Sequence, residues 1–165
     1  KHQKILTYRD SMTGLRNTTA YKEWIHDFFK EIQSKSVEFG VVVLDVNFLK
    51  ETNDKYGHGV GNRLIVVISH IISDIFKRSP VFRIGGDEFV AILQNRDLEN
   101  VEELFVQLDT ECANAFIETE QGNVSVSIAK GYAKYDPEKD TQYMDVFNRA
   151  DNAMYENKRK IKGLK

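Results

Sequence analysis

The sequence has few of the residues and runs that define several common protein classes. It contains one cysteine, Cys112, and only two prolines in 165 residues. A single cysteine excludes an internal disulfide framework and suits a reducing compartment, so we expect a cytoplasmic location. No apolar run approaches the ~20 residues that cross a membrane, and no segment has the pattern of a signal peptide. If the parent protein is membrane-anchored or multidomain, this is expected to be its cytoplasmic part.

An excess of charge of either sign is also missing. The net charge is −2, which gives no electrostatic footprint for duplex nucleic acid or an anionic membrane, so we expect neither as a partner of this fragment. Hydrophobic residues make up 41% of the chain, enough for one folded domain with a core. The first residue is Lys1 rather than methionine, and we expect residues 1–9 to be the end of an upstream linker or signalling helix.

Hydrophobic spacing predicts four helices and one sheet. The helices are expected near residues 18–32, 62–78, 98–116 and 141–160. Thr18 or Thr19 would cap the first helix and Asn62 the second. Strands are expected at 41–44 and 123–133, with a hairpin of 81–84 and 89–93. Strands joined both by a helix and by a hairpin predict an α+β fold, in which a mixed central β-sheet is flanked by helices.

Two acidic segments stand at positions where carboxylates are costly. Asp45 ends the apolar strand, and Asp87 and Glu88 follow Gly85 and Gly86 at the turn of the hairpin. A buried carboxylate without a partner costs several kcal/mol, so acids on adjacent strands indicate a cation such as Mg²⁺ between them. The glycines are expected to supply positive φ and close ligand approach. For either segment alone, solvated turn residues and a strand-end cap are the favoured interpretation. The two segments together, on adjacent strands, favour the metal site.

The order of several motifs resembles one family. The stretch "RIGGDEF" resembles the signature of the GGDEF family, the diguanylate cyclases of bacterial signalling. The stretches "DSMTGLRN", "DVNFLKETNDKYGHGVGN", "SVSIAKG" and "RADNAMYENKRKIKG" resemble four further motifs of that family in the same order. Residues 10–165 are therefore identified as resembling one GGDEF domain.

That resemblance implies a fold and a reaction. The fold would be similar to nucleotidyl cyclases and polymerase palms, with a ferredoxin-like core. The reaction would condense two GTP into cyclic di-GMP and two pyrophosphates. Two Mg²⁺ per active site, for which Mn²⁺ can substitute, a homodimer for turnover and an upstream sensory or regulatory domain are implied with it.

The resemblance also assigns residues to the reaction. Asp45 and Asp87, with the main-chain carbonyl of Val46, would hold the two metals. Glu88 would orient or deprotonate the 3′-hydroxyl, or bind the second metal. The triphosphate would meet the backbone of Phe48 and Leu49 and the side chains of Lys50, Lys158 and Lys162; Asn53 and Asn62 would read the guanine. For the basic run near Lys158, a helix C-terminus balancing its dipole is the competing interpretation.

Three departures from the family pattern bear on function. Asn62 stands where the family usually has aspartate, and Lys162 where it usually has arginine. Phe76 and Ser79 stand at the two positions of the Arg-x-x-Asp product-binding motif, so no product-inhibition site is expected. The alternatives to an active cyclase are a degenerate domain that binds GTP as a sensor, a cyclase whose purine selectivity is relaxed by Asn62, and an unrelated metal-dependent hydrolase.

Overall fold

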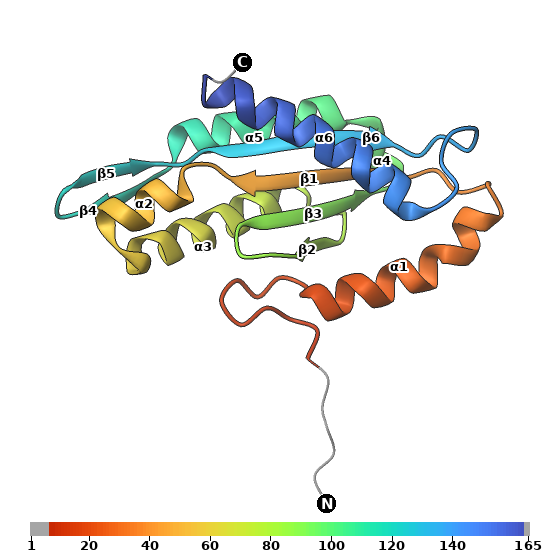
Figure 1. Ribbon diagram of the computed structural model, residues 1–165, viewed down its shortest axis with the longest axis horizontal. Coiled ribbons are helices and arrows are strands. Elements are labelled where there is room, and N and C mark those ends of the chain that lie inside the picture. The colour runs from red at the N-terminus through yellow and green to blue at the C-terminus, as the bar shows by residue number, and fades with distance from the viewer. Residues whose placement is uncertain (1–6, 164–165) are drawn as a thin grey trace, which may run out of the picture.

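Four antiparallel strands form the sheet at the centre of the molecule (Figure 1). The computed structural model describes residues 7–163, and its sheet order is β2 (Val81–Arg83), β3 (Glu88–Leu93), β1 (Gly40–Val46) and β6 (Ile128–Lys134). An isolated bridge between Arg16 and Phe82 adds a parallel contact at the β2 edge. The predicted hairpin is thus β2–β3, its second strand neighbours β1, and the predicted α+β class is confirmed.

Helices cover both faces of this sheet, which explains the unbroken apolar run of β1. Val42 and Leu44 lie in a core cluster with side chains of α3 (His58–Ile75) and α5 (Val101–Asn114). Val41 and Val43 lie in a second cluster with side chains of α1 (Thr18–Gln33) and α6 (Tyr143–Ile161). Successive strand residues point to opposite faces, so a strand covered on both sides needs apolar residues at every position.

Several short elements were not predicted. The expected strand 123–133 is broken, because β5 (Gly122–Ser125) pairs with β4 (Phe116–Thr119) in a separate ribbon before β6 begins. Gly122, at φ +121°, makes the turn of that ribbon possible. The expected helix 98–116 is divided into α4 (Asn95–Glu99) and α5, and α2 (Leu49–Tyr56) is a further helix that was not expected.

Both predicted N-caps are wrong. The Asn17 side chain accepts a hydrogen bond from the Ala20 amide at 3.0 Å, so Asn17 caps α1. Helix α3 begins at His58, four residues before Asn62. Gly57, at φ +91°, separates it from α2 and is the single residue between the two helices. Asn62 consequently lies inside the helix, and its side chain is exposed rather than engaged in capping.

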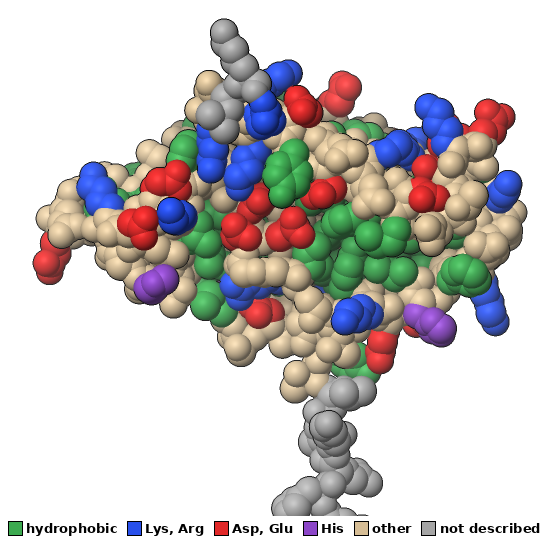
Figure 2. All heavy atoms as spheres, viewed as in Figure 1, with side chains coloured by type: hydrophobic (Ala, Val, Ile, Leu, Met, Phe, Trp, Pro, Cys, Tyr) green, Lys and Arg blue, Asp and Glu red, His purple; other side chains and the backbone are tan. Residues whose placement is uncertain are grey.

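The N-terminal segment is attached to the hairpin. The predicted upstream segment, residues 1–9, lies mostly outside the described residues. At residue 10 an ion pair links this segment to β2, with Arg83 Nη1 3.0 Å from Asp10 Oδ2. None of the helices between residues 7 and 163 has the length and apolar character to cross a bilayer. On the face in Figure 2, acidic and basic side chains are interspersed, as the small net charge suggests.

Candidate active site

The register of β1 against β3 brings the predicted acids to one corner of the sheet. Asp45 and Glu88 are directly paired across the two strands. Asp87 precedes Glu88 in the turn, and its carbonyl accepts a hydrogen bond from the Val46 amide at 3.0 Å. Three carboxylates from segments 42 residues apart in the sequence therefore share one site.

The glycine turn is held by main-chain and arginine contacts rather than by positive φ. Ile84 donates its amide hydrogen to the Glu88 carbonyl at 3.0 Å, and Arg83 Nη2 donates to the Gly86 carbonyl at 2.7 Å. Neither Gly85 nor Gly86 is among the positive-φ residues, so that part of the turn prediction is wrong. A Cβ at Gly86 would meet no atom within 4 Å. The glycines thus leave open space beside the acids, which a ligand can approach.

Burial and mutual repulsion make the ionised form of these carboxyls unfavourable. Burial, with the neighbouring charge of Asp87, raises the pKa of Asp45 to about 6, although Lys158 opposes the shift. Burial, followed by the charges of Asp151, Asp45 and Asp87, raises the pKa of Glu88 to about 7. Asp45 Oδ1 is buried without a hydrogen-bond partner among residues 7–163. Positive charge at this corner would favour the ionised carboxylates.

Lys158 of α6 supplies one such charge. Its Nζ lies 3.0 Å from Asp45 Oδ2 and 3.4 Å from the Val46 carbonyl oxygen. The family resemblance implies that these two oxygens bind metal, and the ammonium shows that a cation is stabilised beside them. The contact also shows that the basic run near Lys158 does more than balance the dipole of α6.

The oxygen atoms at this corner are of the type that Mg²⁺ prefers. Within residues 7–163, no three acidic, histidine or cysteine side chains converge on one metal position. Mg²⁺ does not need such a set, because it keeps several waters and is usually held by one or two carboxylates together with substrate phosphates. Asp45, Asp87 and the Val46 carbonyl provide that smaller set, with Glu88 beside them.

The predicted phosphate contacts lie around the start of α2. Phe48 adopts a left-handed conformation at φ 62°, which is unusual for a bulky residue and strained. The chain turns there into α2, whose first amide groups at Leu49 and Lys50 have no partner within the helix and can face an anion. Lys162 Nζ lies 5.8 Å from the centroid of the Phe48 ring, and Lys50 is exposed. Backbone and lysines thus offer positive charge beside the acids.

The predicted base-reading residues lie on adjoining helices. Asn53 of α2 packs against Gly61 of α3, where an added Cβ would lie 2.8 Å from Asn53 Cγ. Asn53 Oδ1 has no partner within the described part of the chain. Asn62 is exposed and lines an apolar pocket of about 360 Å³ with Val66 and Phe116. Both amides are held on helices, and within residues 7–163 neither the Asn53 Oδ1 atom nor the Asn62 side chain has a hydrogen-bond partner.

The two positions of the product-binding motif offer nothing to a ligand. Phe76 is fully buried in the core. Ser79 donates its hydroxyl to Asp97 Oδ2 at 2.5 Å, so its side chain is engaged. The absence of a product-inhibition site stays a prediction.

Two residues near the site, Arg83 and Asp151, were not predicted from the sequence. Arg83 connects the turn to Asp10, and both residues stand inside the quoted motifs, but their pairing spans 73 positions that no local pattern links. Asp151 of α6 lies close enough to Glu88 to raise the pKa of that carboxyl. Its position on the inward face of the last helix, seven residues before Lys158, was the available signal.

Comparison with known proteins gives the same assignment as the geometry. Residues 7–163 match the family described as "Diguanylate cyclase, GGDEF domain". Diguanylate cyclase DgcS of Shewanella oneidensis is 31% identical over 90% of this chain and 49% of its own length. Cyclic di-GMP phosphodiesterase PdeR of Escherichia coli is 32% identical over 92% of this chain and 22% of its own. The chain thus spans half or less of these curated relatives.

The solved structures agree in fold. The GGDEF domain of DgcB from Caulobacter crescentus, solved in complex with c-di-GMP, superposes with a TM-score of 0.83 at 22% identity. The alignment covers 97% of this chain and 93% of that domain. An α+β domain with an acidic corner at one end of an antiparallel sheet is therefore the class of protein that fold and site define. The chain belongs to the GGDEF domain family of diguanylate cyclases.

Proposed function

We propose that this domain is a Mg²⁺-dependent diguanylate cyclase that condenses two GTP into cyclic di-GMP and releases two pyrophosphates. The observation that carries the proposal is the corner at which Asp45, Asp87 and Glu88 meet beside the Val46 carbonyl and Lys158. Family membership supports it and removes the unrelated hydrolase from consideration. The curated relatives are longer than this chain, so the proposal concerns this domain.

The residues of this site would have separate roles in binding metal, accepting a proton and contacting phosphate. Asp45, Asp87 and the Val46 carbonyl would hold Mg²⁺, which when bound supplies positive charge to the reacting phosphate oxygens. Glu88 orients the 3′-hydroxyl and accepts its proton as that oxygen attacks the α-phosphorus of the other GTP. The electron pair of the broken P–O bond leaves with pyrophosphate. Lys158 lies where it can turn from Asp45 to the phosphates.

The assembly follows from the stoichiometry of the product. Each site would hold one GTP, bound through its triphosphate at the start of α2 and through its base at Asn53 and Asn62. A product with two phosphodiester bonds then needs two sites face to face, so the active species is a two-fold symmetric homodimer. Specific activity should rise with protein concentration across the dimerisation range.

The direct test is an assay with GTP and Mg²⁺ that measures both pyrophosphate and the cyclic dinucleotide. Asp87→Ala should abolish both products while its melting temperature stays close to wild type, because a partly exposed turn residue contributes little to the core. Asp54→Ala, which removes an exposed acid of α2, is the matched control and should keep activity. GTP binding without any product in the wild-type chain would favour the GTP-binding sensor, and unchanged activity in Asp87→Ala would refute the assigned role.

A variant of this function is favoured by one residue, Asn62. Guanine presents two neighbouring donors, N1–H and N2–H, and a carboxylate can accept both. An asparagine amide has one acceptor oxygen and one NH₂ group, so it leaves one of these donors unmet. An unmet buried hydrogen bond costs roughly 1–3 kcal/mol, which corresponds to about tenfold in affinity at the lower half of that range. Adenine offers N1 as acceptor and its 6-amino group as donor, which asparagine matches better.

We therefore expect GTP as the main substrate but a reduced preference for GTP over ATP. The measurement is a competition between GTP and ATP on the wild-type chain and on Asn62→Asp, with products resolved by mass. Asn62→Asp should bind GTP more tightly and reject ATP more strongly. Because Asn62 is exposed and does not cap α3, the substitution should leave stability nearly unchanged. Equal affinity and equal selectivity in the two proteins would show that Asn62 does not read the base.

A further inference from the structure

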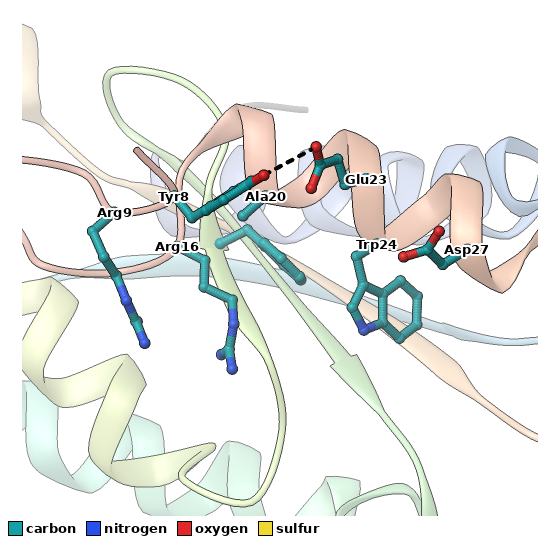
Figure 3. A pocket seen from close by; sticks show the side chains of 8 residues that line it. Tyr8, Arg9, Arg16, Ala20, Glu23, Trp24 and Asp27 are labelled. Atoms are coloured by element: carbon teal, nitrogen blue, oxygen red, sulfur yellow. Dashed lines mark hydrogen bonds between the residues drawn. The ribbon is translucent and has the colours of Figure 1, made fainter. Parts of the chain in front are cut away.

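A second pocket, separate from the acidic corner, lies where the N-terminal segment meets α1 and β2 (Figure 3). Its volume is about 310 Å³, and none of its lining residues belongs to the site described above. Phe82 of β2 forms part of its wall and is fully buried, while Trp24 of α1 is half-buried. The size is that of the smaller ligand pockets of proteins.

Two arginines on one side of this pocket have no anionic partner in the part of the chain that the structure describes. Arg9 and Arg16 are paired across an isolated antiparallel bridge, so their side chains leave the same face of the backbone. Figure 3 shows both guanidinium groups directed the same way. Within residues 7–163 neither forms an ion pair, and the hydrogen bond of Arg9 goes to the Gly14 carbonyl at 3.4 Å. Like charges placed directly opposite are unfavourable, and an anion between them would remove the repulsion.

The rest of the pocket adds the flat apolar surface of Trp24 and two acids, Glu23 and Asp27. Trp24 stands between the arginines and Asp27 in Figure 3. Glu23 accepts a hydrogen bond from the Tyr8 hydroxyl at 3.2 Å, whereas Asp27 has no hydrogen bond within the described residues. The pocket therefore offers two cationic groups, an aromatic ring and a carboxylate, Asp27, that is not hydrogen-bonded within the described residues. A simple anion would contact only the two arginines, and a purely apolar ligand would contact only Trp24.

We propose that this pocket binds a small organic phosphate with a planar, amino-bearing ring, of the nucleoside monophosphate class. The phosphate lies between Arg9 and Arg16, whose forked guanidinium groups each donate two hydrogen bonds to it. The ring packs against Trp24, and its amino group donates to Asp27. This ligand matches all three parts of the pocket at once.

Trp24 is the only tryptophan of the chain, so its fluorescence reports on this pocket directly. The probe is adenosine 5′-monophosphate, titrated in the presence of EDTA so that metal-dependent binding at the acidic corner does not contribute. We expect a saturable change in fluorescence. Arg16→Gln should weaken binding by about tenfold, the effect of losing one charged hydrogen-bonding group. Arg96→Gln, which removes an exposed arginine of α4, is the matched control and should bind as wild type.

Further variants separate this pocket from the acidic corner. Asp87→Asn should leave binding of the probe unchanged, and Arg9→Gln should repeat the loss seen with Arg16→Gln, with melting curves confirming that each variant is folded. Inorganic phosphate and adenosine should each bind more weakly than the monophosphate. The proposal is overturned if no saturable change occurs, if both arginine variants bind as wild type, if Asp87→Asn abolishes binding, or if inorganic phosphate binds as tightly as the nucleotide.

Discussion

The ion pair between Lys158 and Asp45 leads to a prediction about stability and metal together. Replacing Lys158 by methionine keeps most of the side-chain volume and removes the charge that lies 3.0 Å from Asp45 Oδ2. Without Mg²⁺, we expect Lys158→Met to be less stable than wild type. With Mg²⁺, we expect that difference to shrink or reverse, because the ammonium contacts Asp45 Oδ2 and the Val46 carbonyl, the two oxygens at which we propose that the metal is held.

The magnitude follows from the distance and the burial of the pair. At 3.0 Å and an effective dielectric constant of about 20, the Coulomb attraction is roughly 5 kcal/mol before desolvation is subtracted. The side chains are 18% and 14% exposed, between a surface pair and a fully buried one. Breaking a buried pair costs about 3–5 kcal/mol and an exposed pair contributes about 0–1 kcal/mol. Asp45 can limit the loss by taking up a proton, so we expect about 2 kcal/mol.

The assay is urea unfolding of both proteins in EDTA and in saturating Mg²⁺, followed by the transition midpoint at constant slope. Lys160→Met is the matched control, because it removes an exposed lysine of the same helix. Mg²⁺ should stabilise Lys158→Met more than it stabilises wild type or Lys160→Met. The reasoning is refuted if Mg²⁺ stabilises all three proteins equally, or if Lys158→Met in EDTA is as stable as wild type.

Two further predictions concern packing and reactivity. Gly131→Ala should destabilise the fold by about 3 kcal/mol or more, because the added Cβ would overlap the backbone of α6, whereas Gly59→Ala has open space and should be neutral or slightly stabilising in a melting experiment. Cys112 should resist thiol reagents at neutral pH until the protein unfolds, because burial raises the pKa of its thiol to about 11. A fast reaction of the native protein with such a reagent would contradict this.

Patterns that depend on burial could be read from the sequence, because burial leaves a periodic trace. The apolar run of β1 and the hairpin around the glycine turn were predicted, and so was the pairing of that hairpin with β1. The observed register places Asp45 opposite Glu88. Lys158 was assigned by resemblance alone, and its contact with Asp45 depends on how α6 crosses the sheet. That crossing depends on Gly131, whose missing side chain lets the backbone of α6 approach β6.

Elements whose formation depends on a single residue could not be predicted in the same way. Helix α2 has little apolar periodicity, and it follows Phe48, whose left-handed conformation no propensity favours. Helix α3 then starts directly after Gly57, which has φ +91°, and this start lies before the apolar residues of the helix. Asn62 therefore lies inside α3 rather than at its predicted N-cap. The β4–β5 ribbon has only four residues per strand, too few for a period-two pattern to be distinguished from a loop.

The position of Asp45 explains how the fold can maintain a repulsive site. Strand β1 is paired on both sides, so the backbone of Asp45 is fixed against Glu88 on one side and Ala129 on the other. The residues before it, Val43 and Leu44, are fully buried on opposite faces. The backbone therefore holds the carboxyl groups of Asp45 and Glu88 near each other, and a proton or a cation relieves their repulsion. We infer that the acidic corner is already arranged before substrate arrives, with the core of the sheet offsetting the cost of holding it there.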